Sequence, residues 1–226
     1  MRRDLALALL TTAGIVSAAT ADSREDILSR MDQAAASFHT MTADVTHTTH
    51  TAVLNEDDTD NGRVAMKKVA SGEIQGLMEY TKPDHKFFQF EKRKLQIYTP
   101  NDNTVQVYDL GKHGEQLDQF LAIGFGTSSK DLMASFQLNP GGAATVNGKA
   151  ASRVELIPTT ADGKKLLTKI ELWIGPDNYP LQEKLEEPSG DYVLVAYNNV
   201  KINPPLGADA LQLKLAPGAK YEYPQK

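Results

Sequence analysis

The chain has 226 residues, with 29 acidic and 24 basic side chains and a formal net charge of −5. This balance argues against nucleic acid as a partner, because nucleic-acid binding needs a basic stripe, and against strong attraction to anionic lipid headgroups. The chain contains no cysteine, which excludes disulfides, thiolate metal sites and cysteine nucleophiles. Core burial must therefore stabilise the fold, and a chain of this length can bury enough surface.

The first 21 residues have the three parts of a cleavable secretory signal. Two arginines form a basic start, the apolar run 5–19 follows, and an Ala-Thr-Ala exit ends at Ala21. The apolar run is too short for a membrane-spanning helix. We therefore expect cleavage after Ala21 and one exported domain over 22–226. Without a cysteine to carry a lipid anchor, the bacterial periplasm is the expected location.

The next segment predicts a helix over 24–38. Ser23 and Asp26 have the spacing of a capping box. β-Branched residues then predict a long strand over 42–51, and the acidic segment 55–62 is expected to be a turn. Apolar side chains give the helix one apolar face by recurring at helical spacing: Ile27, Leu28, Met31, Ala34, Ala35 and Phe38.

The rest of the chain consists mainly of short alternating segments separated by turn residues. Asn147-Gly148 is a strong hairpin signal. Two short helices, over 115–123 and 130–136, interrupt the pattern and are joined by a glycine-containing connector at 124–126 that we expect to be flexible. Strands at this regular spacing indicate a continuous antiparallel sheet. They are predicted over 63–70, 73–81, 85–92, 94–99, 104–110, 143–146, 149–158, 166–175, 179–187, 191–203 and 210–215.

The strand alternation predicts one apolar face and one polar face. Ile170, Leu172 and Ile174 would share one side of their strand, with Lys169 and Glu171 on the other. A sheet with one dry side curves around its core. We therefore predict a mainly β fold with an α lid: an open, incomplete antiparallel β-barrel of about ten or eleven strands, covered by three short helices.

Catalytic and metal-binding motifs are not found in the sequence. His47 and His50 are three residues apart on a predicted strand, so they would face opposite sides and not chelate a metal together. The acidic segment fails the calcium-loop pattern, because Lys68 would occupy the twelfth position. No nucleophile elbow or phosphate loop occurs. We expect a binding protein, not an enzyme, without metal or cofactor.

The apolar side chains have the parity to line a cavity. A curved sheet of ten or more strands encloses more volume than side chains easily fill, and helices beside a glycine connector would make a suitable lid. For any single residue, ordinary core packing is the alternative. The candidate cavity residues from strands and lid helices are Phe88, Phe90, Ile97, Val107, Leu117, Phe120, Leu121, Met133, Phe136 and Leu172.

Four segments, in order, resemble the periplasmic outer-membrane lipoprotein carriers of the LolA-like family. They are the opening SRMDQ with SFH at 29–39, KP followed by FF and LQIYTP at 82–100, IELWI at 170–174, and LKLAPGA at 213–219. The resemblance implies an open half-barrel whose hydrophobic cavity holds the acyl chains of a lipoprotein. It also implies an inner-membrane ATP-driven extractor that supplies this cargo and an outer-membrane acceptor that receives it, with the carrier itself a monomer.

The resemblance carries over two residue roles. Lys82 stands where the family usually has an arginine that latches the lid in the empty state. Because lysine lacks the planar guanidinium fork, a Lys82 latch would be looser. Met31 stands where the family often has leucine at the cavity mouth, and methionine suits an adaptable contact. Two alternatives stay open: a carrier of glycolipids or isoprenoids, and a lipid- or lipoprotein-sensing regulatory protein.

Overall fold

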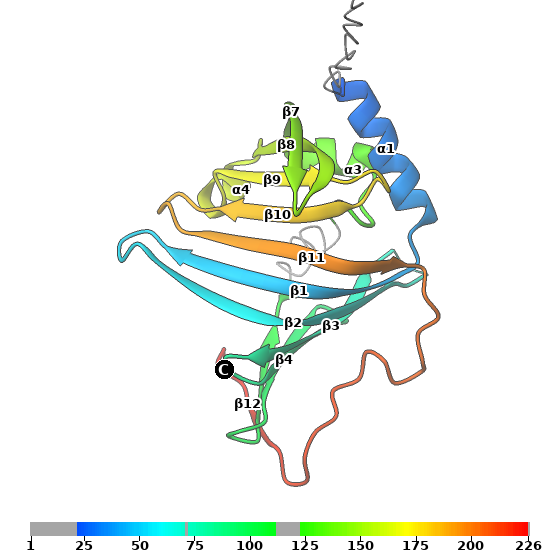
Figure 1. The fold of residues 1–226 in the computed structure, drawn as a ribbon. Helices are drawn as coiled ribbons and strands as arrows, with labels where there is room; N and C mark the ends of the chain where they lie inside the picture. The colour runs from blue at the N-terminus through cyan, green and yellow to red at the C-terminus, as the bar shows by residue number, and fades with distance from the viewer. Residues whose placement is uncertain (1–21, 71, 112–122, 226) are drawn as a thin grey trace, which may run out of the picture.

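The computed structural model describes residues 22–70, 72–111 and 123–225. The expected signal and most of the expected helix 115–123 lie outside this part. The described chain forms one strongly curved sheet that is not closed into a barrel (Figure 1). In chain order its elements are α1 (Arg24–Ser37), β1 (Thr40–Thr51), β2 (Glu56–Lys68), β3 (Ile74–Lys82), β4 (Lys86–Glu91), β5 (Lys94–Thr99), β6 (Thr104–Asp109), α3 (Ser129–Ser135), β7 (Phe136–Val146), β8 (Lys149–Pro158), α4 (Ala161–Leu166), β9 (Lys169–Ile174), β10 (Pro180–Glu186), β11 (Tyr192–Ile202) and β12 (Lys220–Glu222).

The sheet has twelve strands, in the order β12-β6-β5-β4-β3-β2-β1-β11-β10-β9-β8-β7. The pairs are antiparallel except β12, which runs parallel to β6. The predicted open antiparallel sheet is therefore confirmed, with twelve strands in place of ten or eleven and one short parallel edge. The central pair, β1 with β11, joins the two halves of the chain.

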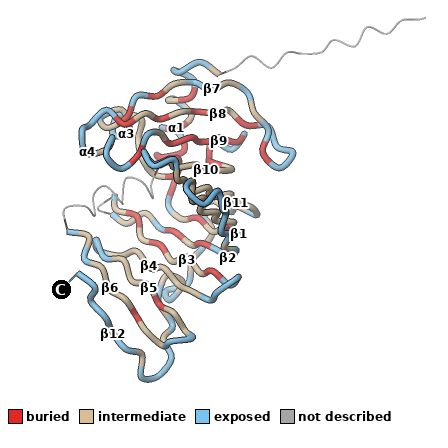
Figure 2. The backbone as a smooth tube through the Cα atoms, turned by 90° about the vertical axis from the view of Figure 1, so that its left-hand side faces the viewer, coloured by how far each residue is buried: buried red, intermediate tan, exposed pale blue. Residues whose placement is uncertain are grey.

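The concave face of the sheet carries the core. The predicted capping box at Ser23 and Asp26 is present at the start of α1, and the buried face of this helix carries Ile27, Met31 and Ala34. Figure 2 shows buried residues along two groups of strands, one around β7–β9 and one around β2 and β3. They form two apolar clusters, a first one around β1–β3 and β11 and a second one around β7–β9 and α3. Helix α1 contributes residues to both.

The connector at 124–126 is packed and not free. Phe125 is only 1% exposed, and its ring lies 6.0 Å from that of Tyr179 and 5.2 Å from that of Tyr197. A β-carbon on Gly124, whose φ is +78°, would lie 2.3 Å from the Pro180 ring. The expectation of a flexible connector is therefore wrong, because Phe125 anchors it in the first cluster.

Three segments differ from the predictions. The acidic segment 55–62 belongs mostly to β2, because β1 is long enough to pair with it as far as Thr51 opposite Glu56. The turn is formed by 52–55 instead. Strand β7 begins at Phe136, well before the predicted 143. Helix α4 occupies a segment for which no element was predicted.

The predicted strand 210–215 is not a strand. This stretch belongs to an extended C-terminal segment (residues 203–219) that crosses the convex face before β12 (Figure 1). Side-chain and backbone groups hold it there: Gln89 Nε2 donates to the Leu211 carbonyl oxygen at 2.6 Å, and the Ala216 N–H donates to Tyr98 Oη at 3.2 Å. The alternating leucines therefore belong to an extended segment without ladder pairing.

Candidate functional site

The pairing register places a continuous row of apolar side chains on the concave face. Phe88 lies opposite Met78 on one side and Ile97 on the other. Met78 in turn lies opposite Val64. Directly opposed residues of antiparallel strands share a face, so this row is one surface from β2 to β5. Phe90, two residues after Phe88, lies on the same face.

The two halves of the concave face differ in how far they are covered. Met31, Phe136 and Leu172 are buried in the second cluster, and Met133 packs against it. Phe88, Phe90 and Ile97 are only half-buried. Side chains on β7–β9 are thus part of a closed core under α1 and α3, while those on β4 and β5 keep accessible apolar surface. This second half is the candidate site.

One predicted cavity residue lies on the opposite face, and three are outside the described residues. Val107 pairs with Gln96, whereas Ile97 pairs with Gln106, so Val107 is on the opposite face from Phe88 and Ile97. The expectation that Val107 lines the concave cavity is wrong, because sequence alternation does not show which face of each strand is the inner one. The other three lie outside the described residues: Leu117, Phe120 and Leu121.

Lys82 ends β3 opposite Asn61, and its side chain is exposed. Within 22–70, 72–111 and 123–225, no ion pair or hydrogen bond of its ammonium group is found. The latch role of Lys82 therefore stays a prediction.

A group of polar side chains sits among the apolar residues of the concave face. Glu183 on β10 lies opposite Val195 and Leu172, so its carboxyl points toward the core. His47 on β1 lies opposite Val195 from the other side. Tyr197, two residues after Val195, completes the arrangement at the centre of the sheet. The sequence does not reveal this group directly. One signal is present: Glu183 occupies the position between Leu181 and Leu185 where period-two alternation would place an apolar residue.

The environment changes the protonation of this group. Burial raises the pKa of Glu183 to about 8, although the neighbouring Tyr197 hydroxyl acts against that rise. Burial also raises the pKa of the Tyr197 hydroxyl, and lowers that of His47 despite the nearby Asp60 carboxylate. All three side chains are therefore mainly uncharged at neutral pH, as expected for polar groups within an apolar surface.

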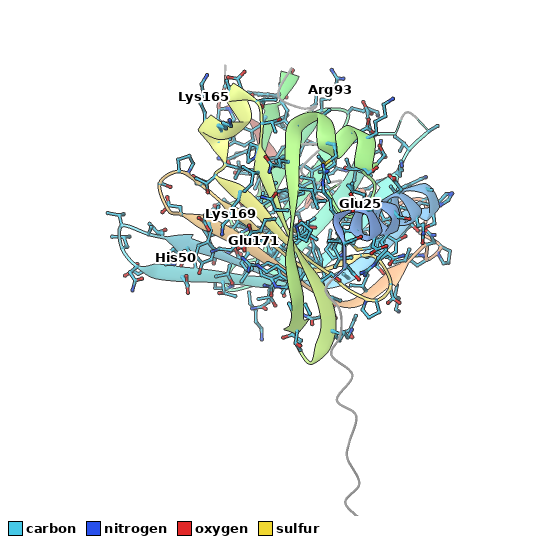
Figure 3. All side chains as sticks on the ribbon, turned by 90° about the horizontal axis from the view of Figure 1, so that it is seen from above. Glu25, His50, Arg93, Lys165, Lys169 and Glu171 are labelled. Atoms are coloured by element: carbon cyan, nitrogen blue, oxygen red, sulfur yellow. The ribbon has the colours of Figure 1, made fainter. Side chains whose placement is uncertain are left out.

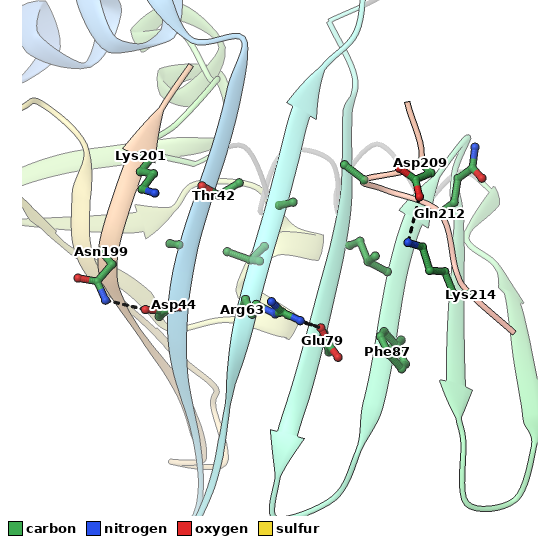
Figure 4. A pocket seen from close by; sticks show the side chains of 15 residues that line it. Thr42, Asp44, Arg63, Glu79, Phe87, Asn199, Lys201, Asp209, Gln212 and Lys214 are labelled. Atoms are coloured by element: carbon green, nitrogen blue, oxygen red, sulfur yellow. Dashed lines mark hydrogen bonds and ion pairs between the residues drawn. The ribbon is translucent and has the colours of Figure 1, made fainter. Parts of the chain in front are cut away.

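The convex face has a different character. A groove of about 920 Å³ lies between strands β1–β4 and the C-terminal segment (Figure 4). Arg63 pairs with Glu79 at 2.7 Å, and Asp209 pairs with Lys214 at 3.0 Å along this groove. Further along the same face, Lys169 and the buried Glu171 of β9 form an ion pair at 3.6 Å (Figure 3). A lining with so many charges does not suit acyl chains, which need an apolar wall.

No protein-family model matches the sequence, and no curated protein is significantly similar to it. Solved structures do match. An uncharacterised conserved protein from Thermus thermophilus has a TM-score of 0.54 at 14% identity, with 89% of this chain and 99% of that chain covered. The open, curved sheet with a helix on its concave side agrees with the half-barrel that the sequence resemblance implied. The chain therefore shares the fold of this solved structure, an open half-barrel.

MucB is another solved structure that matches, with a TM-score of 0.52 at 14% identity. The match covers 84% of this chain but only 62% of the MucB chain. MucB from Pseudomonas aeruginosa is also known in complex with MucA. A LolA superfamily protein from Nitrosomonas europaea matches more weakly, with a TM-score of 0.42 at 12% identity over 85% of this chain and 99% of that one.

Among residues 22–70, 72–111 and 123–225, no group of three or more histidine, aspartate and glutamate side chains could hold a metal ion. None of the helices in that part of the chain combines the length and apolarity needed to cross a membrane.

Proposed function

We propose that this protein is a periplasmic carrier that shields the acyl chains of a lipid or lipoprotein on its concave face. The observation that carries the proposal is the row of half-buried apolar side chains at Met78, Phe88, Phe90 and Ile97, continuous with the closed core. Each buried CH₂ contributes about 0.8 kcal/mol. A long acyl chain on this surface would therefore be stabilised by roughly 10 kcal/mol against exposure to water.

The cargo that we propose is an acylated lipoprotein. The four sequence segments that resemble the lipoprotein carriers support this choice. In this role the protein would receive its cargo from an inner-membrane ATP-driven extractor and pass it to an outer-membrane acceptor. A cavity for glycolipid or isoprenoid cargo would use the same apolar surface, so cargo identity is the main alternative within the carrier proposal.

A lipid- or lipoprotein-sensing regulatory protein is the second candidate. The likeness to MucB, which forms a complex with MucA, favours it. Mass spectrometry of material that co-purifies from the native periplasm separates the candidates. Acylated proteins would support the lipoprotein carrier, and free glycolipids or isoprenoids the other carrier. A specific membrane-protein partner with no bound lipid would support the sensor.

The concave site itself is tested by two neighbouring phenylalanines on opposite faces of β4. Phe88 faces the concave row, whereas Phe87 lines the convex groove; both are half-buried. Phe88→Asp is expected to abolish binding of a fluorescent fatty-acyl probe, because a charge would have to be buried against the acyl chain. Phe87→Asp is the matched control and should retain binding.

Circular dichroism of both variants establishes that they fold, and Ile97→Asp provides a second concave variant. Equal loss of probe binding in the Phe87 and Phe88 variants would contradict the concave site. Unchanged binding in both would contradict it as well.

A further inference from the structure

The polar group at the centre of the concave face has features that core packing does not explain. The Glu183 side chain is 6% exposed and lies between the apolar residues Leu172 and Val195. Its Oε1 atom has no hydrogen-bond partner among the described residues. The same holds for His47 Nδ1, which is 3.9 Å from the nearest Asp60 oxygen.

Unpartnered buried polar atoms are costly, at about 1–3 kcal/mol each. Native proteins contain few of them, and each calls for an explanation. Two such atoms lie here on β10 and β1, which flank the same strand, β11. A pair of unmet hydrogen-bonding groups on one apolar surface is the arrangement of a binding site that holds one polar part of a mostly apolar ligand.

The protonation of the group selects the kind of ligand. A neutral carboxyl group carries an O–H and donates a hydrogen bond, as a protonated aspartate does in the ketosteroid isomerase site. The Tyr197 hydroxyl on β11 hydrogen-bonds the Glu183 carboxyl. His47 on β1 lies on the other side of β11, with Asp60 on β2 and Tyr80 on β3 further out. Tyr80 has its pKa raised above the normal range, so it too keeps its proton. The centre of the site thus offers uncharged donors.

We propose that Glu183 and Tyr197 form a subsite for the carbonyl oxygen that joins an acyl chain to the rest of its ligand, either an ester or an amide. This inference rests on the proposed carrier function and specifies how the apolar row fixes the depth of its cargo. The acyl chain would extend along the apolar row toward Phe88. The Tyr80 ring connects the polar group with the apolar row, because its centroid lies 5.5 Å from that of His47 and 5.4 Å from that of Phe88.

The test compares two phospholipids of equal chain length, one with ester-linked and one with ether-linked chains, in displacement of a fluorescent acyl probe. Only the ester lipid carries the carbonyl. The wild type is expected to bind the ester lipid about tenfold more tightly, the effect of one hydrogen bond to a buried group. Glu183→Leu and Tyr197→Phe should bring the two affinities closer, while Glu183→Gln, whose amide still donates, should keep the preference.

The competing occupant is an ammonium group, which would need an ionised Glu183. In that case Glu183→Gln would lose as much affinity as Glu183→Leu, and an alkylamine would displace the probe better than the ester lipid. That outcome overturns the inference. Equal binding of ester and ether lipids by the wild type also overturns it, while leaving the carrier proposal intact. If no lipid displaces the probe, the carrier function itself is overturned.

Stability separates a binding role from a structural one. Only the Oε1 atom of Glu183 lacks a partner, because the Tyr197 hydroxyl hydrogen-bonds the same carboxyl. Replacing both partners with apolar groups of similar shape is nearly neutral or stabilising, so the double variant Glu183→Leu/Tyr197→Phe should unfold at the same or a higher urea concentration than the wild type. A large loss of stability would assign Glu183 to the core and overturn the inference.

A diacylglyceryl peptide and a phospholipid offer the same ester carbonyl. Their relative ability to displace the fluorescent acyl probe identifies which of the two the subsite prefers.

Discussion

The guanidinium group of Arg30 in α1 donates a hydrogen bond of 2.6 Å to the carbonyl oxygen of Gly175, which lies directly after β9. The same group donates to Asn178 Oδ1 at 2.8 Å and Ser152 Oγ at 3.1 Å, and pairs with Asp22. One side chain thus ties the helix to the far half of the sheet. The planar fork of arginine allows it to serve several acceptors at once.

Arg30→Met is therefore expected to lower the free energy of unfolding by about 1–3 kcal/mol, because several acceptors lose a charged donor. Urea unfolding followed by circular dichroism measures this. Arg63→Met is the matched control: Arg63 is 69% exposed and pairs with Glu79 on the surface, so its loss should cost at most about 1 kcal/mol. Equal effects of the two substitutions would contradict the anchoring role of Arg30.

Gly124→Ala is expected to destabilise the fold more than Gly148→Ala. Both glycines have positive φ, +78° and +77°, so both substitutions cause a backbone strain of about 1 kcal/mol. Only at Gly124 would the new β-carbon collide with Pro180, while Gly148 has open space around it. The difference in unfolding free energy between the two variants isolates the steric contribution. No difference would show that the connector adjusts freely.

Lys82→Leu is expected to alter release of cargo more than its capture, because a latch acts on opening of the lid. Capture is measured by loading of a fluorescent lipid, and release by transfer from loaded protein to outer-membrane vesicles. Lys94→Leu is the control, because Lys94 is also an exposed lysine at one end of a strand but lies at the start of β5. Unchanged release in the Lys82 variant would remove the latch role.

The stability of the protein should depend on pH through Glu183. Its pKa is about 8 in the fold against 4.5 when unfolded. Between these values the folded state holds a proton that the unfolded state has lost, so the free energy of unfolding falls by about 1.4 kcal/mol per pH unit as pH rises. Glu183→Gln lacks this dependence, and its advantage over the wild type should grow from pH 5.5 to 8.

Urea unfolding at several pH values measures this difference, and the exposed Glu187→Gln should follow the wild type throughout. Because His47 is present in all three proteins, its own titration cancels in the comparison. A constant difference between wild type and Glu183→Gln would contradict the raised pKa.

The strand boundaries that the sequence predicted well are those set by local turn chemistry. The segments 94–99 and 149–158 agree with β5 and β8. Arg93 and Asn147, just before them, have positive φ, which tight hairpin turns require. The acidic segment 55–62 was predicted wrongly because its pairing depends on the length of β1. His50 Nδ1 donates to Asp57 Oδ1 at 2.7 Å there, a contact that local propensity does not reveal.

The candidate site was predictable only in part. That Ile97 shares the face of Phe88 follows from the pairing of β4 with β5. Period-two alternation correctly placed Phe88 and Phe90 on one face of their strand, since that period follows from backbone geometry alone. It did not show that Val107 faces the convex side, because the face of each strand depends on the register with its neighbour. The position of Glu183 beside Tyr197 likewise depends on the pairing of β10 with β11.

The order of polar and apolar residues along the chain was enough to determine a curved sheet with one dry face. Helix caps and hairpin turns also came from residues close together in sequence. The meeting of β1 with β11, where Asn199 donates to Asp44 at 2.6 Å across 155 residues, was decided by the tertiary structure. Apolar burial has no preferred direction, so it favours a core without specifying which distant strands, and therefore which polar side chains, come together inside it.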